Sequence, residues 1–210
     1  MTAIQNPQLE KVYNAKTREQ SRDAYDEWSK TYEADVFSFG YRVAAVAATV
    51  WARFVELNSG PILDAGCGTG LQSEPLKLAG YEPITGIDLS PGMLEIARQK
   101  NIYAELHKMA LGEHLDFADD NFANTISVGT ITPGHAPPNS FEELIRLTRR
   151  DGLIIFGMRV DELQDPAYLT TMAEYESGGR WVKTFETDGF ASMPLGEPDV
   201  INKVFVYKIK

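Results

Sequence analysis

The chain has few cysteines and fewer basic than acidic residues, and each shortage excludes a class of protein. One cysteine in 210 residues excludes a disulfide framework and a cysteine-based zinc site, and it fits a reducing compartment. Lysine and arginine number 20 against 30 aspartates and glutamates, so the formal net charge is −10. Because so acidic a chain repels phosphate backbones and anionic lipids, we expect no nucleic-acid partner and no membrane partner.

Long apolar runs are also missing. The longest, 43–52, is rich in alanine and is shorter than the roughly 20 residues that span a bilayer. Residues 1–7 contain no basic segment leading into an apolar run, as a secretory signal would. With 43% hydrophobic and 24% charged residues, the composition is that of a globular protein. We therefore expect one soluble, cytoplasmic domain that is a monomer or a homodimer.

The pattern of apolar residues divides this domain into three parts. We expect residues 1–57 to form a helical lid, 58–160 a cofactor-binding core, and 161–210 a C-terminal helix and strand pair. In the core, short apolar segments alternate with helical ones, which is typical of parallel strands with helices on both faces of the sheet. The core strands are expected at 62–63, 83–87, 102–108, 125–128 and 153–158, with helices that start near Leu71, Ser90 and Asn139.

The two flanking parts have their own elements. Lid helices are expected over 17–38 and 41–57, separated at Gly40. The last part predicts a helix over 166–177 and two strands that pair antiparallel because no long helix joins them. The predicted fold is a Rossmann-like, mostly parallel sheet of seven strands, the last two at 180–187 and 202–209.

A glycine-rich loop follows the first expected strand. Residues 64–70 read Asp-Ala-Gly-Cys-Gly-Thr-Gly, and glycine permits a tight turn with close approach of the backbone to a ligand. The dinucleotide fingerprint G-x-G-x-x-G is not met, because position 71 is leucine. The Asp64 carboxylate would also lie beside a pyrophosphate. A ligand with a sulfonium or ammonium group and no phosphate suits this loop better.

A second carboxylate, Asp88, follows the strand expected at 83–87. At the end of the second strand, a carboxylate can accept hydrogen bonds from both ribose hydroxyls of a nucleoside. The alternative is a carboxylate that supports the helix starting at Ser90.

These residues resemble those of the class I S-adenosylmethionine-dependent methyltransferases. Residues 64–70 match the family's first motif, Asp88 its ribose-binding acid, and 90–94 the helix start whose methionine lines the adenine pocket. The resemblance covers roughly residues 20–160 and implies S-adenosyl-L-methionine as the cofactor and methyl transfer as the activity. More narrowly, three segments resemble the small Williams–Beuren-region methyltransferases, namely 25–28, 127–129 and 134–138.

The resemblance also implies which residues surround the cofactor. The family usually has an acidic residue after strand three that binds the adenine amine, but here Leu111 stands near that place unless Glu113 takes it. We therefore expect apolar contacts and backbone groups to hold the adenine. The expected cofactor-binding residues are Tyr25, Tyr32, Asp64, Gly66, Cys67, Gly68, Gly70, Asp88, Leu89, Met93, Met109, Ala110, Leu111 and Val128.

A general base is needed only if the methyl acceptor arrives protonated. His135 is the candidate, because it follows the strand at 125–128, at the sheet edge where open α/β folds bind ligands. Its alternatives are a donor that positions the substrate and a surface histidine. Arg159 ends the strand at 153–158 and suits either an acceptor carboxylate or an ion pair with Asp161 or Glu162.

The acceptor is expected to be a small molecule that enters between the lid, the loop 130–138 and the tail segment 186–198, which reads as an ordered loop. Two other functions stay open, a non-catalytic protein that binds S-adenosylmethionine or S-adenosylhomocysteine, and a nicotinamide-dependent oxidoreductase. No metal site is expected, since the acidic residues at 116–120 lie in a polar turn. The expected substrate-contacting residues are Trp28, Thr130, His135 and Arg159.

Overall fold

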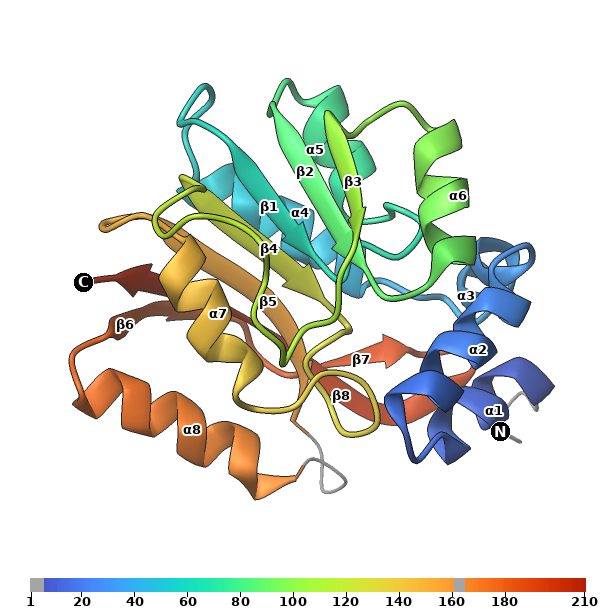
Figure 1. The fold of residues 1–210 in the computed structure, drawn as a ribbon. Helices are drawn as coiled ribbons and strands as arrows, with labels where there is room; N and C mark the ends of the chain where they lie inside the picture. Colours follow the sequence, from blue (N-terminus) through green and yellow to red (C-terminus); the bar gives the residue numbers. More distant parts are fainter. Residues whose placement is uncertain (1–5, 161–164) are drawn as a thin grey trace.

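A sheet of eight strands runs through the middle of the protein (Figure 1). The computed structural model describes residues 6–160 and 165–210. The strands are β1 (Ile62–Ala65), β2 (Ile84–Asp88), β3 (Glu105–Lys108), β4 (Asn124–Val128), β5 (Leu153–Arg159), β6 (Trp181–Glu186), β7 (Phe190–Met193) and β8 (Glu197–Ile209). Their order is β3-β2-β1-β4-β5-β8-β6, with β7 paired to β8 outside this path. The strands from β3 to β5 are parallel, whereas β8 runs antiparallel to β5, β6 and β7.

The predicted fold class is confirmed, with one strand more than expected. The expected C-terminal pair is β6 and β8, and it is antiparallel. The expectation of a loop over 186–198 is wrong, because β7 and the beginning of β8 form a hairpin there, with Phe190 opposite Asn202. This hairpin gives a weak signal, since β7 has four residues and its partner strand contains Pro198 and Asp199, which are rare in strands.

Helices cover both faces of the sheet (Figure 1). One face packs against α4 (Val43–Phe54) and α5 (Ser73–Leu78), and the other against α7 (Ser140–Leu147) and α8 (Pro166–Ser177). The helix α6 (Pro91–Gln99) contacts β2 and β3. The helix expected over 41–57 as part of the lid corresponds to α4, and α4 packs against the sheet. Its Trp51 is fully buried in the same cluster as Ile155 of β5.

Three short helices remain as the lid: α1 (Pro7–Asn14), α2 (Arg18–Trp28) and α3 (Tyr32–Ser38). The single helix expected over 17–38 is broken after Trp28, because the Asp35 carboxylate accepts hydrogen bonds from Trp28 Nε1 at 2.6 Å and Thr31 Oγ1 at 3.1 Å. The helix α1 was not expected from the sequence, although its start carries a usable signal. The side chain of Asn6 caps two backbone N–H groups and Pro7 follows it in the first turn.

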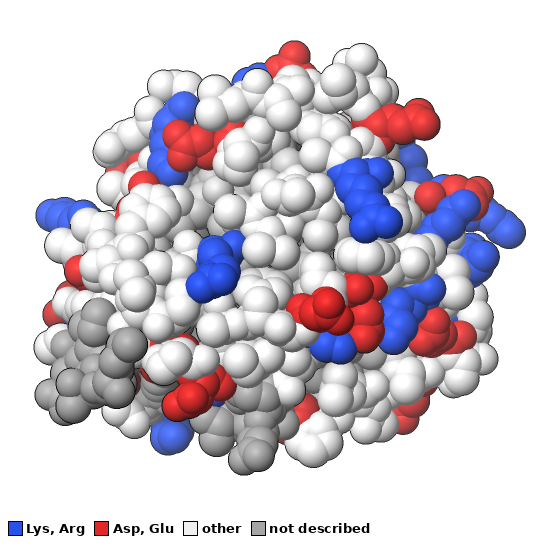
Figure 2. All heavy atoms as spheres, turned by 180° about the vertical axis from the view of Figure 1, so that it is seen from behind, with Lys and Arg blue, Asp and Glu red and all other residues white. Residues whose placement is uncertain are grey.

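The surface carries charges of both signs. On the face seen in Figure 2, acidic and basic side chains are interspersed. The longest helices of the described ranges, α4 and α8, have 12 residues each. Within these ranges, none has the length and apolar character that crossing a membrane requires.

Candidate active site

A cavity lies beneath the lid at the carboxyl ends of β1, β2 and β4, and we call it the first cavity. It brings together most of the residues expected around the cofactor. Those that line it are Tyr25, Tyr32, Gly66, Cys67, Gly68, Asp88, Leu89, Met93, Met109, Ala110, Leu111 and Val128. Sequence reasoning missed further wall residues: Thr69, Leu71, Gly129 and Ala136, which adjoin expected site residues in sequence, and Arg18, Ser21, Tyr41 and Gln72.

The glycine loop forms the floor of the first cavity. Gly66 has φ +76°, and a Cβ there would lie 2.2 Å from Thr130 Oγ1, so any side chain would collide with the loop after β4. Gly68 has φ +54° and nothing within 4 Å of the position where a Cβ would stand. Beside it, Thr69 Oγ1 is buried without a hydrogen-bond partner in the described part of the chain. The open space and the unsatisfied hydroxyl fit a polar ligand on this loop.

Among the described residues that line the first cavity, Asp88 is the one that carries a carboxylate. Its Oδ2 accepts a hydrogen bond from Gly68 N at 2.8 Å, and its Oδ1 accepts one from Ser90 N at 2.8 Å. Burial raises the pKa of Asp88, although these two hydrogen bonds oppose the shift. Each carboxylate oxygen keeps a further lone pair for a ligand. Ser90 caps α6 through Met93 N, so the predicted helix start is confirmed.

Two residues expected at the cofactor, Asp64 and Gly70, do not line the cavity. The Asp64 carboxylate is fully buried and accepts hydrogen bonds from Ser73 Oγ at 2.5 Å, Tyr103 Oη at 2.7 Å and Gln72 Nε2 at 2.8 Å. Burial raises the pKa of Asp64 to about 6 against the opposing effect of these bonds. Gly70, with φ +92°, packs against Tyr103. Both residues therefore hold the loop from behind.

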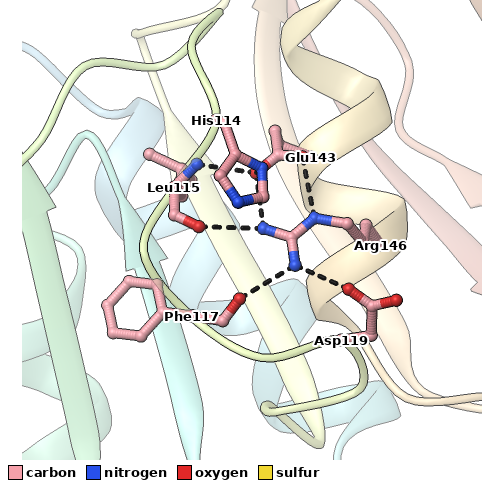
Figure 3. Close-up of polar contacts among 6 residues, drawn as sticks. All are labelled: His114, Leu115, Phe117, Asp119, Glu143 and Arg146. Atoms are coloured by element: carbon pink, nitrogen blue, oxygen red, sulfur yellow. Dashed lines mark hydrogen bonds and ion pairs between the residues drawn. The ribbon is translucent and has the colours of Figure 1, made fainter.

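The loop after β3 forms the wall that carries Met109, Ala110 and Leu111. Glu113 does not take the place of the missing acid, because its exposed carboxylate pairs with Arg18 of the lid. An arginine on α7 anchors the continuation of this loop, as Figure 3 shows. Arg146 Nη1 donates to the carbonyl oxygen of Phe117 at 2.9 Å, and Nη2 donates to that of Leu115 at 2.9 Å.

Two carboxylates complete this anchor (Figure 3). Arg146 Nη2 lies 2.6 Å from Glu143 Oε2 and Nη1 lies 2.7 Å from Asp119 Oδ1. Hydrogen bonds from Arg146 hold the pKa of Glu143 below its usual range. Asp119, one of the acids of the polar turn, is thus an ion-pair partner. Across residues 6–160 and 165–210, no group of three or more metal-ligating side chains could hold a metal ion.

Arg146→Ala is expected to lower the free energy of unfolding by about 2 kcal/mol, since it removes a charged donor from the carbonyl oxygens of Leu115 and Phe117 and the ion-pair partner of Glu143. Because the anchored loop continues into the wall at 109–111, ligand affinity of the first cavity should fall as well. Urea denaturation measures the first effect. Arg150→Ala removes an exposed arginine and serves as the control. Equal stabilities of the two variants would contradict the anchoring role.

A second cavity lies next to the first, between the lid, the loop 131–135 and the ends of β5 and β8. Trp28 and Arg159, two residues expected at the substrate, line it, and His135 lines both cavities, whereas Thr130 lines only the first. Asp161 and Glu162, the alternative partners of Arg159, lie outside the described residues. The residues common to both cavities are Tyr25, Tyr32, Tyr41, Val128, Gly129 and His135.

The lid is tied to the core beside Asp88. Asp26 of α2 accepts a hydrogen bond from Gly92 N at 2.8 Å and another from Ser90 Oγ, at the start of α6. Lys100 also pairs with Glu33 of α3 at 2.7 Å. These contacts keep the tyrosines of the lid over the first cavity.

Known proteins resemble this chain in sequence. Residues 63–156 match a family described as methyltransferase domain. The chain is 33% identical over 163 residues to human methyltransferase-like protein 27, an alignment that covers 75% of this chain and 66% of that protein. It is 37% identical over 126 residues to demethylmenaquinone methyltransferase of Chlorobaculum parvum, covering 56% and 50%. It is 33% identical over 103 residues to 18S rRNA (guanine(1575)-N(7))-methyltransferase of Saccharomyces cerevisiae, covering 47% and 38%. The chain thus aligns with less than two thirds of the length of these relatives.

Solved structures share the fold at low identity. The [4+2]-cyclase SpnF superimposes with a TM-score of 0.73 at 15% identity, over 93% of this chain and 97% of that chain. A SAM-dependent methyltransferase from Thermotoga maritima, described as a possible histamine N-methyltransferase, gives a TM-score of 0.65 at 17% identity, over 89% and 98%. These likenesses show the fold alone.

Proposed function

The chain belongs to the class I S-adenosyl-L-methionine-dependent methyltransferases, and we propose that it moves a methyl group from this cofactor to a small organic molecule in the second cavity. The family and cofactor predicted from the sequence are thereby confirmed. One observation supports the acceptor site: the two cavities share a wall, so a ligand of the first cavity faces the second. We further propose that the described residues form a single domain and that the protein acts in the cytoplasm.

The residues of the first cavity fit the cofactor. In this proposal Asp88 accepts the ribose hydroxyls, and the loop 66–69 with the unsatisfied Thr69 hydroxyl holds the amino-acid end. The adenine lies among Leu89, Met93 and the wall at 109–111, with no described carboxylate for its amine. The cofactor supplies a methyl group on a positively charged sulfur. The lid and the loops position the two reactants and exclude water from them. These two effects account for much of the acceleration of a displacement reaction.

Charge and lining favour a small acceptor over a nucleic acid. The net charge of −10 opposes binding to phosphate backbones. The second cavity is enclosed mostly by apolar and aromatic side chains, including Trp28, Val36 and Met193, and its polar residues are Thr132, His135, Arg159, Ser192 and Asn202. Such a lining is typical of sites for small organic molecules. The Chlorobaculum relative, named for a quinone precursor, fits this view, whereas the yeast relative is named for an RNA.

A bulky residue in the second cavity tests this proposal. Thr132 lines only the second cavity and is half-buried on a loop, so Thr132→Trp should fold. S-adenosylhomocysteine formation is followed with a panel of phenols, amines, thiols and carboxylates, and cofactor affinity by calorimetry. We expect turnover by the wild-type protein, and in Thr132→Trp a loss of at least about tenfold with cofactor affinity within about threefold. Cofactor binding without turnover of any panel member would instead indicate a non-catalytic binding protein. Preference for a nicotinamide dinucleotide would overturn the assignment.

A further inference from the structure

A hydrogen-bonded pair, Tyr25 and His135, stands where the two cavities meet. Tyr25 Oη lies 2.7 Å from His135 Nε2, and His135 Nδ1 lies 3.3 Å from the carbonyl oxygen of Pro133. Because a carbonyl oxygen only accepts, Nδ1 carries the hydrogen, and Nε2 accepts from the Tyr25 hydroxyl. Both ring nitrogens are engaged, so a proton from a bound acceptor reaches the imidazole through Tyr25.

The surroundings keep both members of the pair uncharged near neutral pH. Burial raises the pKa of the Tyr25 hydroxyl above its ordinary value, and burial lowers the pKa of the His135 imidazole. Nε2 therefore carries no proton of its own and accepts the hydrogen bond of Tyr25, whose hydroxyl keeps its hydrogen until another proton replaces it. The other titratable and charged groups that line the two cavities are Tyr13 of α1, Arg18 of α2, Tyr32 of α3, Tyr41, Cys67 of the glycine loop, Asp88 at the end of β2 and Arg159 at the end of β5.

We propose that Tyr25 and His135 form a proton relay for an acceptor that presents an uncharged O–H group on a planar apolar ring, that is, a phenol. The inference rests on the proposed function. A lone pair of the phenol oxygen forms the bond to the methyl carbon, while the sulfur–methyl bond breaks and leaves its electron pair on sulfur. The phenol proton passes to Tyr25 Oη as the tyrosine hydrogen passes to His135 Nε2. One positive charge disappears from sulfur and one appears on the imidazole, which later gives its proton to solvent.

The lining of the second cavity and the chemistry of the pair select this class together. Aromatic and apolar side chains such as Trp28, Val36 and Met158 suit a flat ring. A carboxylate or a thiolate arrives already ionised, so a buried relay would have no proton to move. A phenol keeps its proton near neutral pH, as the tyrosine side chain does, and needs a group that takes it.

Paired probes test the relay in the full chain. Phenol and 2-naphthol present O–H groups, whereas thiophenol and 2-naphthalenethiol have similar shapes and ionise more readily. We expect Tyr25→Phe and His135→Gln each to lower the ratio of oxygen to sulfur methylation by on the order of 100-fold. Tyr175→Phe is the matched comparison, since it removes a hydroxyl from a tyrosine of α8 that lines neither cavity, and its ratio should change less than about threefold. Wild-type oxygen methylation should fall as the pH drops through the His135 midpoint, and His135→Gln should lose this dependence.

A second readout does not depend on turnover. The ¹⁵N resonances of the His135 ring report its tautomer, and we expect the Nδ1–H form, with the Nε2 resonance shifted in Tyr25→Phe. An unshifted Nε2 resonance, or equal loss of oxygen and sulfur methylation in Tyr25→Phe, overturns the relay. A wild-type protein that methylates thiols but no phenol, or neither, overturns the acceptor class. Failure to bind S-adenosylmethionine would instead overturn the proposed function on which the relay rests.

Discussion

Asp88→Ala is expected to lower the affinity for S-adenosylmethionine by on the order of 100-fold or more. The proposed contact consists of two hydrogen bonds from ribose hydroxyls to a carboxylate, and each such bond contributes about 1.5–3 kcal/mol. Asp88 is suited to this contact because the backbone N–H groups of Gly68 and Ser90 fix both of its oxygens from the protein side. Calorimetric titration of the wild-type and variant proteins with the cofactor measures the change.

A matched control separates loss of contact from loss of structure. Asp23→Ala removes an exposed carboxylate of the lid that pairs with Arg22, so cofactor affinity should stay within about twofold of the wild-type value. Circular dichroism checks that Asp88→Ala remains folded, because it also deprives two backbone groups of their acceptor. A folded Asp88→Ala protein with unchanged affinity would show that Asp88 serves only the start of α6.

Gly66→Ala is expected to destabilise the fold by about 2–5 kcal/mol. The left-handed backbone at Gly66, with φ +76°, costs an L-residue about 1–2 kcal/mol. In addition, the new Cβ would collide with Thr130, whose Cβ would lie 2.7 Å away and whose Oγ1 would lie 2.2 Å away, and overpacking of this kind costs about 1–3 kcal/mol. Urea denaturation gives the free energy of unfolding directly.

Gly179 offers a control for the backbone part of this cost. It has φ +69° and nothing within 4 Å of the place that a Cβ would occupy, so Gly179→Ala should lose only about 1–2 kcal/mol. Removing the obstacle in the double variant Gly66→Ala with Thr130→Gly should make the Gly66 substitution less costly than it is alone. If Gly66→Ala were no less stable than Gly179→Ala, the close packing of the loops after β1 and β4 would not contribute to the loss of stability.

The sequence predicts the floor of the first cavity well because local chemistry determines it. Closely spaced glycines after a strand favour a tight turn through their own backbone freedom, and Ser90-Pro91 starts a helix through its own hydroxyl and ring. The place of Asp88 at the cavity is predicted from its position at the end of a strand. These features need no distant partner, so residue types and spacing suffice for them.

The features that sequence reasoning missed depend on distant partners. One of the three donors that hold the Asp64 carboxylate behind the loop is Tyr103, 39 residues later in the chain. The pairing of Tyr25 with His135 spans 110 residues, and Tyr41 reaches both cavities only because the lid folds back over the sheet. The apolar pattern over 41–57 likewise predicts a helix but not that it packs against the sheet, because the surface that an apolar stripe covers depends on distant residues.

The central claim is that the first cavity holds S-adenosylmethionine with its sulfur toward the second cavity. A crystal structure of the protein with S-adenosylhomocysteine tests it most directly. We predict that the ribose hydroxyls lie within hydrogen-bond distance of Asp88 and that the sulfur faces the wall formed by Tyr25 and His135. A ribose bound away from Asp88, or a sulfur turned away from that wall, would contradict the account.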